Sequence, residues 1–185
     1  MEVSYSQSFE DEQLHQILQL QRDNLPQNIS EEEAVKQGFV TVEHDFDLLK
    51  RMNQPHPHIV AISEEQVIAY ALVMLRDLEQ DIPVLVPMLE EINKTVYQDT
   101  MLGDASYVVM GQVCVGKDFR GKGVFSGLYH KMKESMAPYF SYLITEIDVR
   151  NTRSVRAHAK VGFETIKTYS SPDGRKWDLV LLELT

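Results

Sequence analysis

The chain has 185 residues, of which 43% are hydrophobic and 25% charged, and this composition excludes a disordered protein. A formal net charge of −10 argues against a general nucleic-acid binder, because such proteins carry a basic face. No basic leader with an apolar core opens the chain, and no apolar run reaches membrane-spanning length. We therefore expect a soluble cytoplasmic protein with one domain over residues 1–185 and no membrane partner.

Strand and helix patterns alternate along the whole chain. In order, they predict a strand at 3–9, helices at 10–24, 30–38 and 45–52, strands at 59–62 and 66–74, a helix at 84–97, a strand at 106–115, a helix at 121–136, a strand at 142–149, a helix at 151–160, and strands at 163–170 and 176–184. The helix at 30–38 is expected from a capping box, in which Ser30 bonds the Glu33 amide.

Cysteine and histidine residues raise the question of thiol or metal chemistry. Cys114 is the chain's only cysteine and stands between two valines, so it is predicted to be a small buried strand residue rather than a nucleophile. His56 and His58 have no third ligand at suitable spacing nearby. The sequence therefore predicts no metal site.

Residues 113–125 run from an apolar strand through a basic glycine loop into a helix. Lys117, Arg120 and Lys122 crowd the positive end of that helix, where a cation costs about 0.3–1 kcal/mol and an anion gains as much. Glycines at 121 and 123 let the main chain approach a ligand, and the first helical N–H groups lack internal partners. The stretch predicts a phosphate or pyrophosphate site.

Two phosphate-binding motifs compete for this loop. Gly116 to Lys122 follows the spacing of a P-loop, but Gly123 stands where that motif needs a Ser or Thr hydroxyl for magnesium. Arg120-Gly121-Lys122-Gly123-Val124 resembles the signature Arg/Gln-x-x-Gly-x-Gly/Ala of the GNAT superfamily of acyl-CoA-dependent N-acetyltransferases, with Phe125 in place of the last small residue.

A second motif favours the GNAT resemblance. Asn151-x-x-Ser154-x-x-x-His158-x-Lys160-Val161-Gly162-Phe163 resembles that superfamily's Asn-x-x-Ala-x-x-x-Tyr-x-x-x-Gly-Phe at the same spacing, one helix and one strand after the first motif. The resemblance implies an α+β fold in α/β/α layers, with a mixed, mostly antiparallel sheet of about seven strands flanked by helices. It also implies that the central strands at 106–115 and 142–149 splay apart.

The same resemblance implies acetyl-CoA as the cofactor and indicates where it binds. Its pantetheine arm pairs with main-chain groups of Val113 and Val115, and its pyrophosphate lies on the amides of 120–125. The predicted cofactor-binding residues are Val113, Cys114, Val115, Arg120, Gly121, Lys122, Gly123, Val124, Phe125, Asn151, Ser154 and His158.

Amide formation requires a neutral amine and benefits from protonation of the leaving thiolate, so a base and an acid are expected. His158 occupies the position of the family's tyrosine and is the predicted acid, since a histidine with a pKa of about 6.5 donates a proton near neutral pH. Glu146 is the predicted base, and Asp148 on the same face of its strand is the other candidate.

These patterns together predict an enzyme that transfers an acetyl group from acetyl-CoA to the amine of a small molecule, by direct attack in a ternary complex. A cationic acceptor would suit the acidic chain. The alternative is a non-catalytic acyl-CoA sensor or interaction module, and a P-loop kinase is a more remote one. The identity of the amine and the presence of a homodimer stay open.

Overall fold

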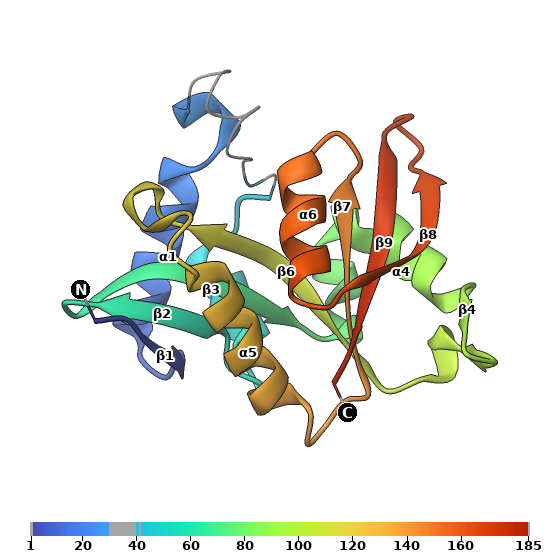
Figure 1. The fold of residues 1–185 in the computed structure, drawn as a ribbon, viewed down its shortest axis with the longest axis horizontal. Coiled ribbons are helices and arrows are strands. Elements are labelled where there is room, and N and C mark those ends of the chain that lie inside the picture. Colours follow the sequence, from blue (N-terminus) through green and yellow to red (C-terminus); the bar gives the residue numbers. More distant parts are fainter. Residues whose placement is uncertain (1, 30–39, 41, 185) are drawn as a thin grey trace. The chain divides into compact units, whose positions relative to one another are not determined.

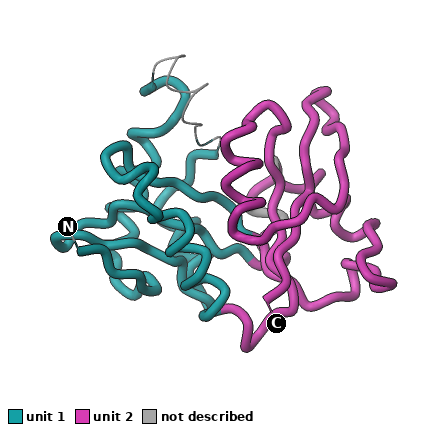
Figure 2. The backbone as a smooth tube through the Cα atoms, viewed as in Figure 1, with its two compact units in different colours: residues 1–74, 110–135 teal, residues 75–109, 136–185 magenta. Residues whose placement is uncertain are grey.

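The computed structural model describes residues 2–29, 40 and 42–184, which form two compact units (Figure 1, Figure 2). Unit 1 comprises Met1–Met74 and Met110–Ser135, and unit 2 comprises Leu75–Val109 and Met136–Thr185. The strand order is β1-β2-β3-β6-β7-β9-β8, and β6 (Tyr107–Val115) is shared by the two units. The expected helix at 30–38 lies outside the described residues, and a single domain over 1–185 stays a prediction.

Unit 1 combines antiparallel strands with helices on both faces (Figure 1). Its elements are β1 (Ser4–Gln7), α1 (Asp11–Asp23), α3 (Phe46–Met52), β2 (Ile59–Ser63), β3 (Gln66–Met74), the end of β6 and α5 (Val124–Met136). Helices α1 and α3 pack on one face, α1 through buried Leu14 and Ile17 at helical spacing and α3 through buried Leu49. Helix α5 covers the other face, where a Cβ on Gly127 would lie 2.1 Å from the Tyr5 ring.

The hairpin of β2 and β3 confirms the expected strands at 59–62 and 66–74. Its turn falls at Glu64 and Glu65, whose φ angles of 51° and 64° match the right-handed twist of the flanking strands. Most of β3 is buried, as a strand covered on both faces requires. The hairpin therefore supplies the centre of the core of unit 1.

Unit 2 holds the other strands and two helices. Its elements are α4 (Val86–Asn93), β4 (Val96–Tyr97), β5 (Thr100–Met101), the start of β6, β7 (Tyr142–Asp148), α6 (Thr152–Lys160), β8 (Glu164–Ser170) and β9 (Lys176–Glu183). Strand β6 pairs in parallel with β7 at Tyr107–Val109, whereas β9 pairs antiparallel with both β7 and β8. Helix α6 lies on one face of these strands and α4 on the other (Figure 1). The mixed, mostly antiparallel sheet of seven strands is as expected.

Short 3-10 turns link several of these elements. They span Pro26–Asn28, Arg76–Asp81, Pro83–Leu85, Leu102–Asp104 and Lys117–Phe119. None of the helices within the described ranges combines the length and the apolar composition that crossing a bilayer demands.

Two predicted helix boundaries are wrong. The helix expected at 84–97 ends at Asn93, and Val96–Tyr97 instead pairs with Thr100–Met101 through a turn at Gln98 and Asp99, both with positive φ. The helix expected at 121–136 begins at Val124, because Gly121 and Gly123 have φ angles of 76° and 84° and so cannot be helical.

Candidate functional site

The loop between β6 and α5 in unit 1 presents main-chain donors. A 3-10 turn at Lys117–Phe119 is closed by the Phe119 amide, which donates to the Gly116 carbonyl at 2.9 Å. The Gly127 amide donates to the Gly123 carbonyl at 3.1 Å, so Gly123 is the residue at which the helical hydrogen bonds begin. The amides just after Gly123 therefore lack intrahelical acceptors and lie at the positive end of α5, which is the arrangement of an anion site.

Side chains around this loop leave its outer surface open. Gly121, Lys122 and Gly123 are exposed, and the Lys122 ammonium lies 5.8 Å from the centre of the Phe119 ring. Val124 is buried, so only its main chain can contact a ligand. The Phe125 ring packs against Tyr129 one turn along α5, at 4.9 Å between ring centres.

The Arg120 side chain, which the sequence motif assigns to cofactor binding, is hydrogen-bonded to other parts of unit 1. Its Nε donates to the Val115 carbonyl at 3.0 Å, and its Nη2 donates to Asn24 Oδ1 at 2.5 Å. The guanidinium therefore ties the middle of the loop to the end of β6 and to the end of α1. Asn24 was not singled out in the sequence, because nothing in its spacing relates it to the loop.

The strand before the loop has two kinds of main-chain groups. The Gly116 amide donates to the Ile68 carbonyl of β3 at 2.8 Å, so by alternation the main-chain groups of Val113 and Val115 point to the opposite edge of β6. Cys114 between them is buried, and burial raises the pKa of its thiol to about 12. Its burial confirms the expected buried strand residue, and its place in the cofactor site stays a prediction.

In unit 2, Glu146 on β7 and Tyr169 on β8 form a hydrogen-bonded pair. Both side chains are partly buried, and the Tyr169 hydroxyl donates to Glu146 Oε2. Burial raises the pKa of Glu146 to about 7, although the hydrogen bond from Tyr169 acts in the opposite direction. A carboxylate that titrates near neutral pH is suited to accept a proton in catalysis.

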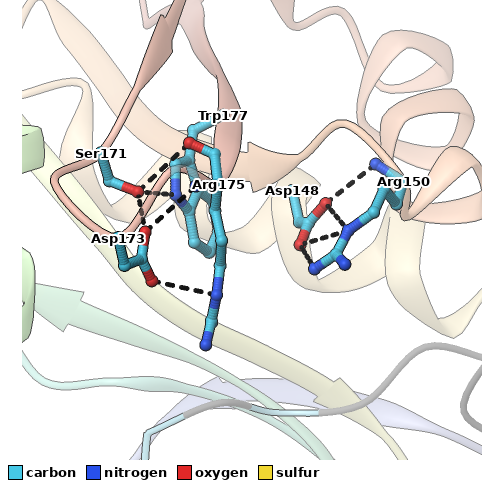
Figure 3. Close-up of polar contacts among 6 residues, drawn as sticks. All are labelled: Asp148, Arg150, Ser171, Asp173, Arg175 and Trp177. Atoms are coloured by element: carbon cyan, nitrogen blue, oxygen red, sulfur yellow. Dashed lines mark hydrogen bonds and ion pairs between the residues drawn. The ribbon is translucent and has the colours of Figure 1, made fainter.

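Asp148, the other candidate base, is held by Arg150 (Figure 3). The Arg150 guanidinium donates to both carboxylate oxygens, at 3.0 Å from Nε to Oδ1 and 2.6 Å from Nη2 to Oδ2. These bonds lower the pKa of Asp148 below its ordinary value. A carboxylate so stabilised in its charged form is a weak base, so the geometry favours Glu146.

Neighbouring charges surround both carboxylates. Arg175 bonds Asp173 in the turn between β8 and β9, at 3.0 Å from Nε to Oδ2 (Figure 3). On the face that carries Tyr169, Lys167 of β8 pairs with Glu91 of α4 at 2.8 Å. The charges near the Glu146–Tyr169 pair therefore include the ion pair of Lys167 and Glu91, in which the two charges offset each other.

The second sequence motif also lies in unit 2 and folds as predicted at its ends. Asn151 caps α6, since its side chain accepts a hydrogen bond from the Ser154 amide at 3.0 Å. Gly162 has a φ of 102°, and the Phe163 amide donates to the His158 carbonyl at 3.1 Å to close the helix.

His158 is buried within this motif. Its Nδ1 lies 2.9 Å from the Ser154 carbonyl and 3.2 Å from Ser154 Oγ, so Nδ1 carries a proton that the carbonyl accepts. Burial lowers the pKa of His158 to about 4, hence the ring is neutral at pH 7. A neutral imidazole is a poor acid, and the catalytic role of His158 stays a prediction that this environment disfavours.

In unit 1, His58 is held by two main-chain hydrogen bonds. His58 donates from Nε2 to the Leu49 carbonyl at 3.1 Å and accepts at Nδ1 from the Val73 amide at 3.0 Å. Burial lowers the pKa of His58 to about 3. In the part of the chain that the structure describes, no three His, Cys, Asp or Glu residues gather as a metal site would require.

The predicted site residues thus fall into two groups. Unit 1 holds those of 113–125 on one strand, loop and helix start, and unit 2 holds Glu146, Asn151, Ser154 and His158. Tyr169 is a residue that sequence reasoning missed, because its link to Glu146 depends on the register of the strand between them. The glycine loop before α5 and the mixed, mostly antiparallel sheet match the arrangement that the sequence resemblance implied.

Comparison with known protein families identifies the family of this chain. A profile of the Acetyltransferase (GNAT) family matches residues 14–163, and the chain belongs to that family. No curated protein sequence matches the chain.

Solved structures with the same fold share little sequence with this chain. The N-acetyltransferase from Staphylococcus aureus Mu50 is 18% identical, with 100% of each chain covered and a TM-score of 0.65. Arabidopsis thaliana NAA60 in complex with acetyl-CoA is 12% identical, with 98% of this chain and 99% of that chain covered and a TM-score of 0.67. The ribosomal-protein-S18-alanine N-acetyltransferase from Escherichia coli is 11% identical, with 100% and 95% covered and a TM-score of 0.62.

Proposed function

We propose that the protein is an N-acetyltransferase that uses acetyl-CoA to acetylate a primary amine. The observation that carries the proposal is the loop 116–123, whose glycines at positive φ expose amides at the start of α5. Membership of an acetyltransferase family and the acetyl-CoA in the similar NAA60 structure support acetyl-CoA as the ligand of this loop.

The cofactor in this proposal is held mainly by main-chain groups. The amides of 121–125 bind its pyrophosphate, and the exposed Lys122 adds a positive charge. Val113 and the Val115 amide offer main-chain groups to an extended pantetheine arm, since the Val115 carbonyl accepts from Arg120, and Cys114 is buried. Asn151, Ser154 and His158 are assigned to the cofactor by resemblance to the family motif.

Glu146 is the proposed general base. Acetyl-CoA supplies an activated acetyl thioester, and the acceptor must lose a proton to attack it because most amines are protonated at neutral pH. Glu146 takes that proton and passes it to solvent, and its pKa of about 7 is close to the optimum for this exchange. Tyr169 orients the Glu146 carboxylate and stabilises its ionised form.

The acceptor in the proposal is the amine of a small molecule. The formal net charge of −10 favours a cationic acceptor, by steering rather than by direct contact. The competing acceptor is a protein or peptide amine, since the similar Escherichia coli enzyme acts on ribosomal protein S18. A panel of polyamines, aminoglycosides, amino acids and N-terminal peptides separates these classes by turnover.

A sensor that binds acyl-CoA without turnover is the second candidate. The neutral, buried state of His158 favours it, because the position of the family's acid carries a residue that donates poorly at pH 7. Both candidates predict CoA binding, so acetyl transfer to any amine of the panel, lost in Glu146→Gln, distinguishes the enzyme from the sensor.

Thermal unfolding with acetyl-CoA, CoA, or ATP plus magnesium tests the cofactor directly. A ligand at 100 times its dissociation constant stabilises by about 2.7 kcal/mol, so we expect a clear rise in Tm with both CoA species. A rise with ATP alone would return the loop to the P-loop interpretation and overturn the proposal.

A further inference from the structure

The Arg120 side chain lies back along its own loop. Among its hydrogen bonds, Nε donates to the Val115 carbonyl at 3.0 Å and Nη2 donates to Asn24 Oδ1 at 2.5 Å. Hydrogen bonds from a guanidinium are roughly twice as strong as neutral ones, so both contacts restrain the loop. One acceptor belongs to the strand that enters the loop, and the other belongs to a different element of unit 1.

Asn24 is fixed in place at the end of α1. It is 6% exposed, and its Nδ2 donates to the Leu20 carbonyl at 2.8 Å. Its amide donates to the Gln21 carbonyl at 3.0 Å, and its own carbonyl accepts from the Val40 amide at 3.2 Å. Asn24 therefore presents Oδ1 to the guanidinium from a position that α1 and the chain at Val40 both hold.

The main chain at Gly121 and Gly123 is not tightly packed. Nothing lies within 4 Å of where a Cβ on Gly121 or Gly123 would be, so packing does not fix this part of the main chain. The buried Val124 side chain anchors the loop after Gly123, and Arg120 anchors it before Gly121. An anchored loop loses less conformational entropy when a ligand orders it.

We propose that Asn24 is a positioning residue for cofactor binding, which acts by holding Arg120 against Val115 so that the loop amides are preorganised. The inference rests on the proposed function, because it takes CoA as the ligand of the loop. It assigns Arg120 to the support of the loop rather than to direct contact with the pyrophosphate, and it gives the end of α1 a part in cofactor affinity.

Calorimetric titration of CoA into single variants tests this role. Asn24→Ala removes the acceptor, and we expect the Kd for CoA to rise roughly tenfold. Asn24→Asp keeps an oxygen toward Arg120 but loses the donor to the Leu20 carbonyl, so its Kd should lie between those of the wild type and Asn24→Ala. Asn28→Ala is the matched control, since Asn28 Nδ2 bonds the Arg22 carbonyl at 2.6 Å near the same helix end.

Kinetics and a double variant separate positioning from simple stability. Asn24→Ala should raise the KM for acetyl-CoA and leave kcat at saturation unchanged, and it should have no further effect on Kd when combined with Arg120→Ala. Additive effects on Kd, or a lower Tm with unchanged Kd, would overturn the inference. Should Asn24→Ala not fold, Arg120→Ala alone must still raise Kd.

CoA binding by the wild-type protein separates a failure of this inference from a failure of the proposed function. CoA binding by the wild type with an unchanged Kd in Asn24→Ala overturns the role of Asn24 alone. No CoA binding by the wild type overturns the proposed function, and the role of Asn24 with it.

Discussion

The loop 116–123 in unit 1 and the Glu146–Tyr169 pair in unit 2 are built from different chemical groups. The loop offers main-chain amides, which every residue except proline carries, and its geometry depends on glycine conformation. The pair offers one carboxylate and one hydroxyl, so its chemistry depends on two particular side chains. The loop should therefore tolerate changes of side-chain chemistry and fail when its backbone is altered, and the pair should behave in the opposite way.

The largest expected effect is in the pair. Glu146→Gln removes the base without a change of size, and kcat should fall about a hundred- to ten-thousandfold while the Kd for CoA stays constant. Steady-state kinetics with a saturating amine measures the loss. Asp148→Asn is the matched control on the same strand, since Asp148 is bound to Arg150, and kcat should change little.

A backbone change should affect the loop next most strongly. Gly123→Ala must adopt a φ near 84°, which costs about 1–2 kcal/mol for a residue with a Cβ. Because no atom lies within 4 Å of the added Cβ, the loop can relax to another conformation without unfolding the protein. Binding of CoA must then return the loop to the strained conformation. We expect the Kd for CoA to rise about five- to thirtyfold in calorimetry.

Gly174→Ala provides the same strain at a different place. Gly174 has a φ of 80° in the turn between β8 and β9, again with no atom within 4 Å. Hydrogen bonds close this turn, so the cost should appear in Tm and not in CoA affinity. Equal effects of both glycine variants on CoA binding would contradict the distinction between the two regions.

Removal of the hydroxyl from the pair should shift a pH profile. The Tyr169 hydroxyl stabilises ionised Glu146, so Tyr169→Phe should raise the pKa of Glu146 above about 7. The base acts when ionised, hence the acidic limb of kcat/KM should move up by about one pH unit, and activity should recover at higher pH. Lys167 and Glu91, the charged pair nearby, are unchanged in this variant. An unshifted limb would mean that Glu146 is not the titrating group.

The smallest expected effect comes from a side chain of the loop. Lys122→Ala removes a charge worth about 0.3–1 kcal/mol, so the Kd for CoA should rise only about two- to fivefold, and less at high salt. Lys133→Ala, in the last turn of α5, should leave the Kd unchanged. A loss of binding with Lys122→Ala would show that side-chain charge, rather than the main chain, holds the anion.

Local patterns in the sequence predicted most of the fold. The strands at 59–62 and 66–74 and the helix after Glu10 were found because each carries its own periodicity and its own turn or cap. The strands at Val96–Tyr97 and Thr100–Met101 were missed because Ile92 and Val96 keep the spacing of a helix. The turn between them places Gln98 and Asp99 at positive φ. Neither residue is a glycine or an asparagine, so the sequence did not indicate this turn.

The candidate site was predictable to the extent that it is local. Glycines at 121 and 123 mark the loop in the sequence, and the cap by Asn151 follows from its position before α6. Tyr169 and Asn24 could not be found in the same way. Their partners, Glu146 and Arg120, lie far along the chain, and only strand register and the packing of α1 bring them together.

We expect the folded protein to react little with thiol reagents, because Cys114 is buried. It is the only cysteine of the chain, it is 7% exposed, and its pKa is about 12, so almost no thiolate forms at neutral pH. A chromogenic disulfide can therefore report free CoA continuously during turnover without labelling the enzyme. For the same reason, a cysteine introduced on the exposed surface of α5 would be the one accessible thiol, so a fluorophore could be attached there alone.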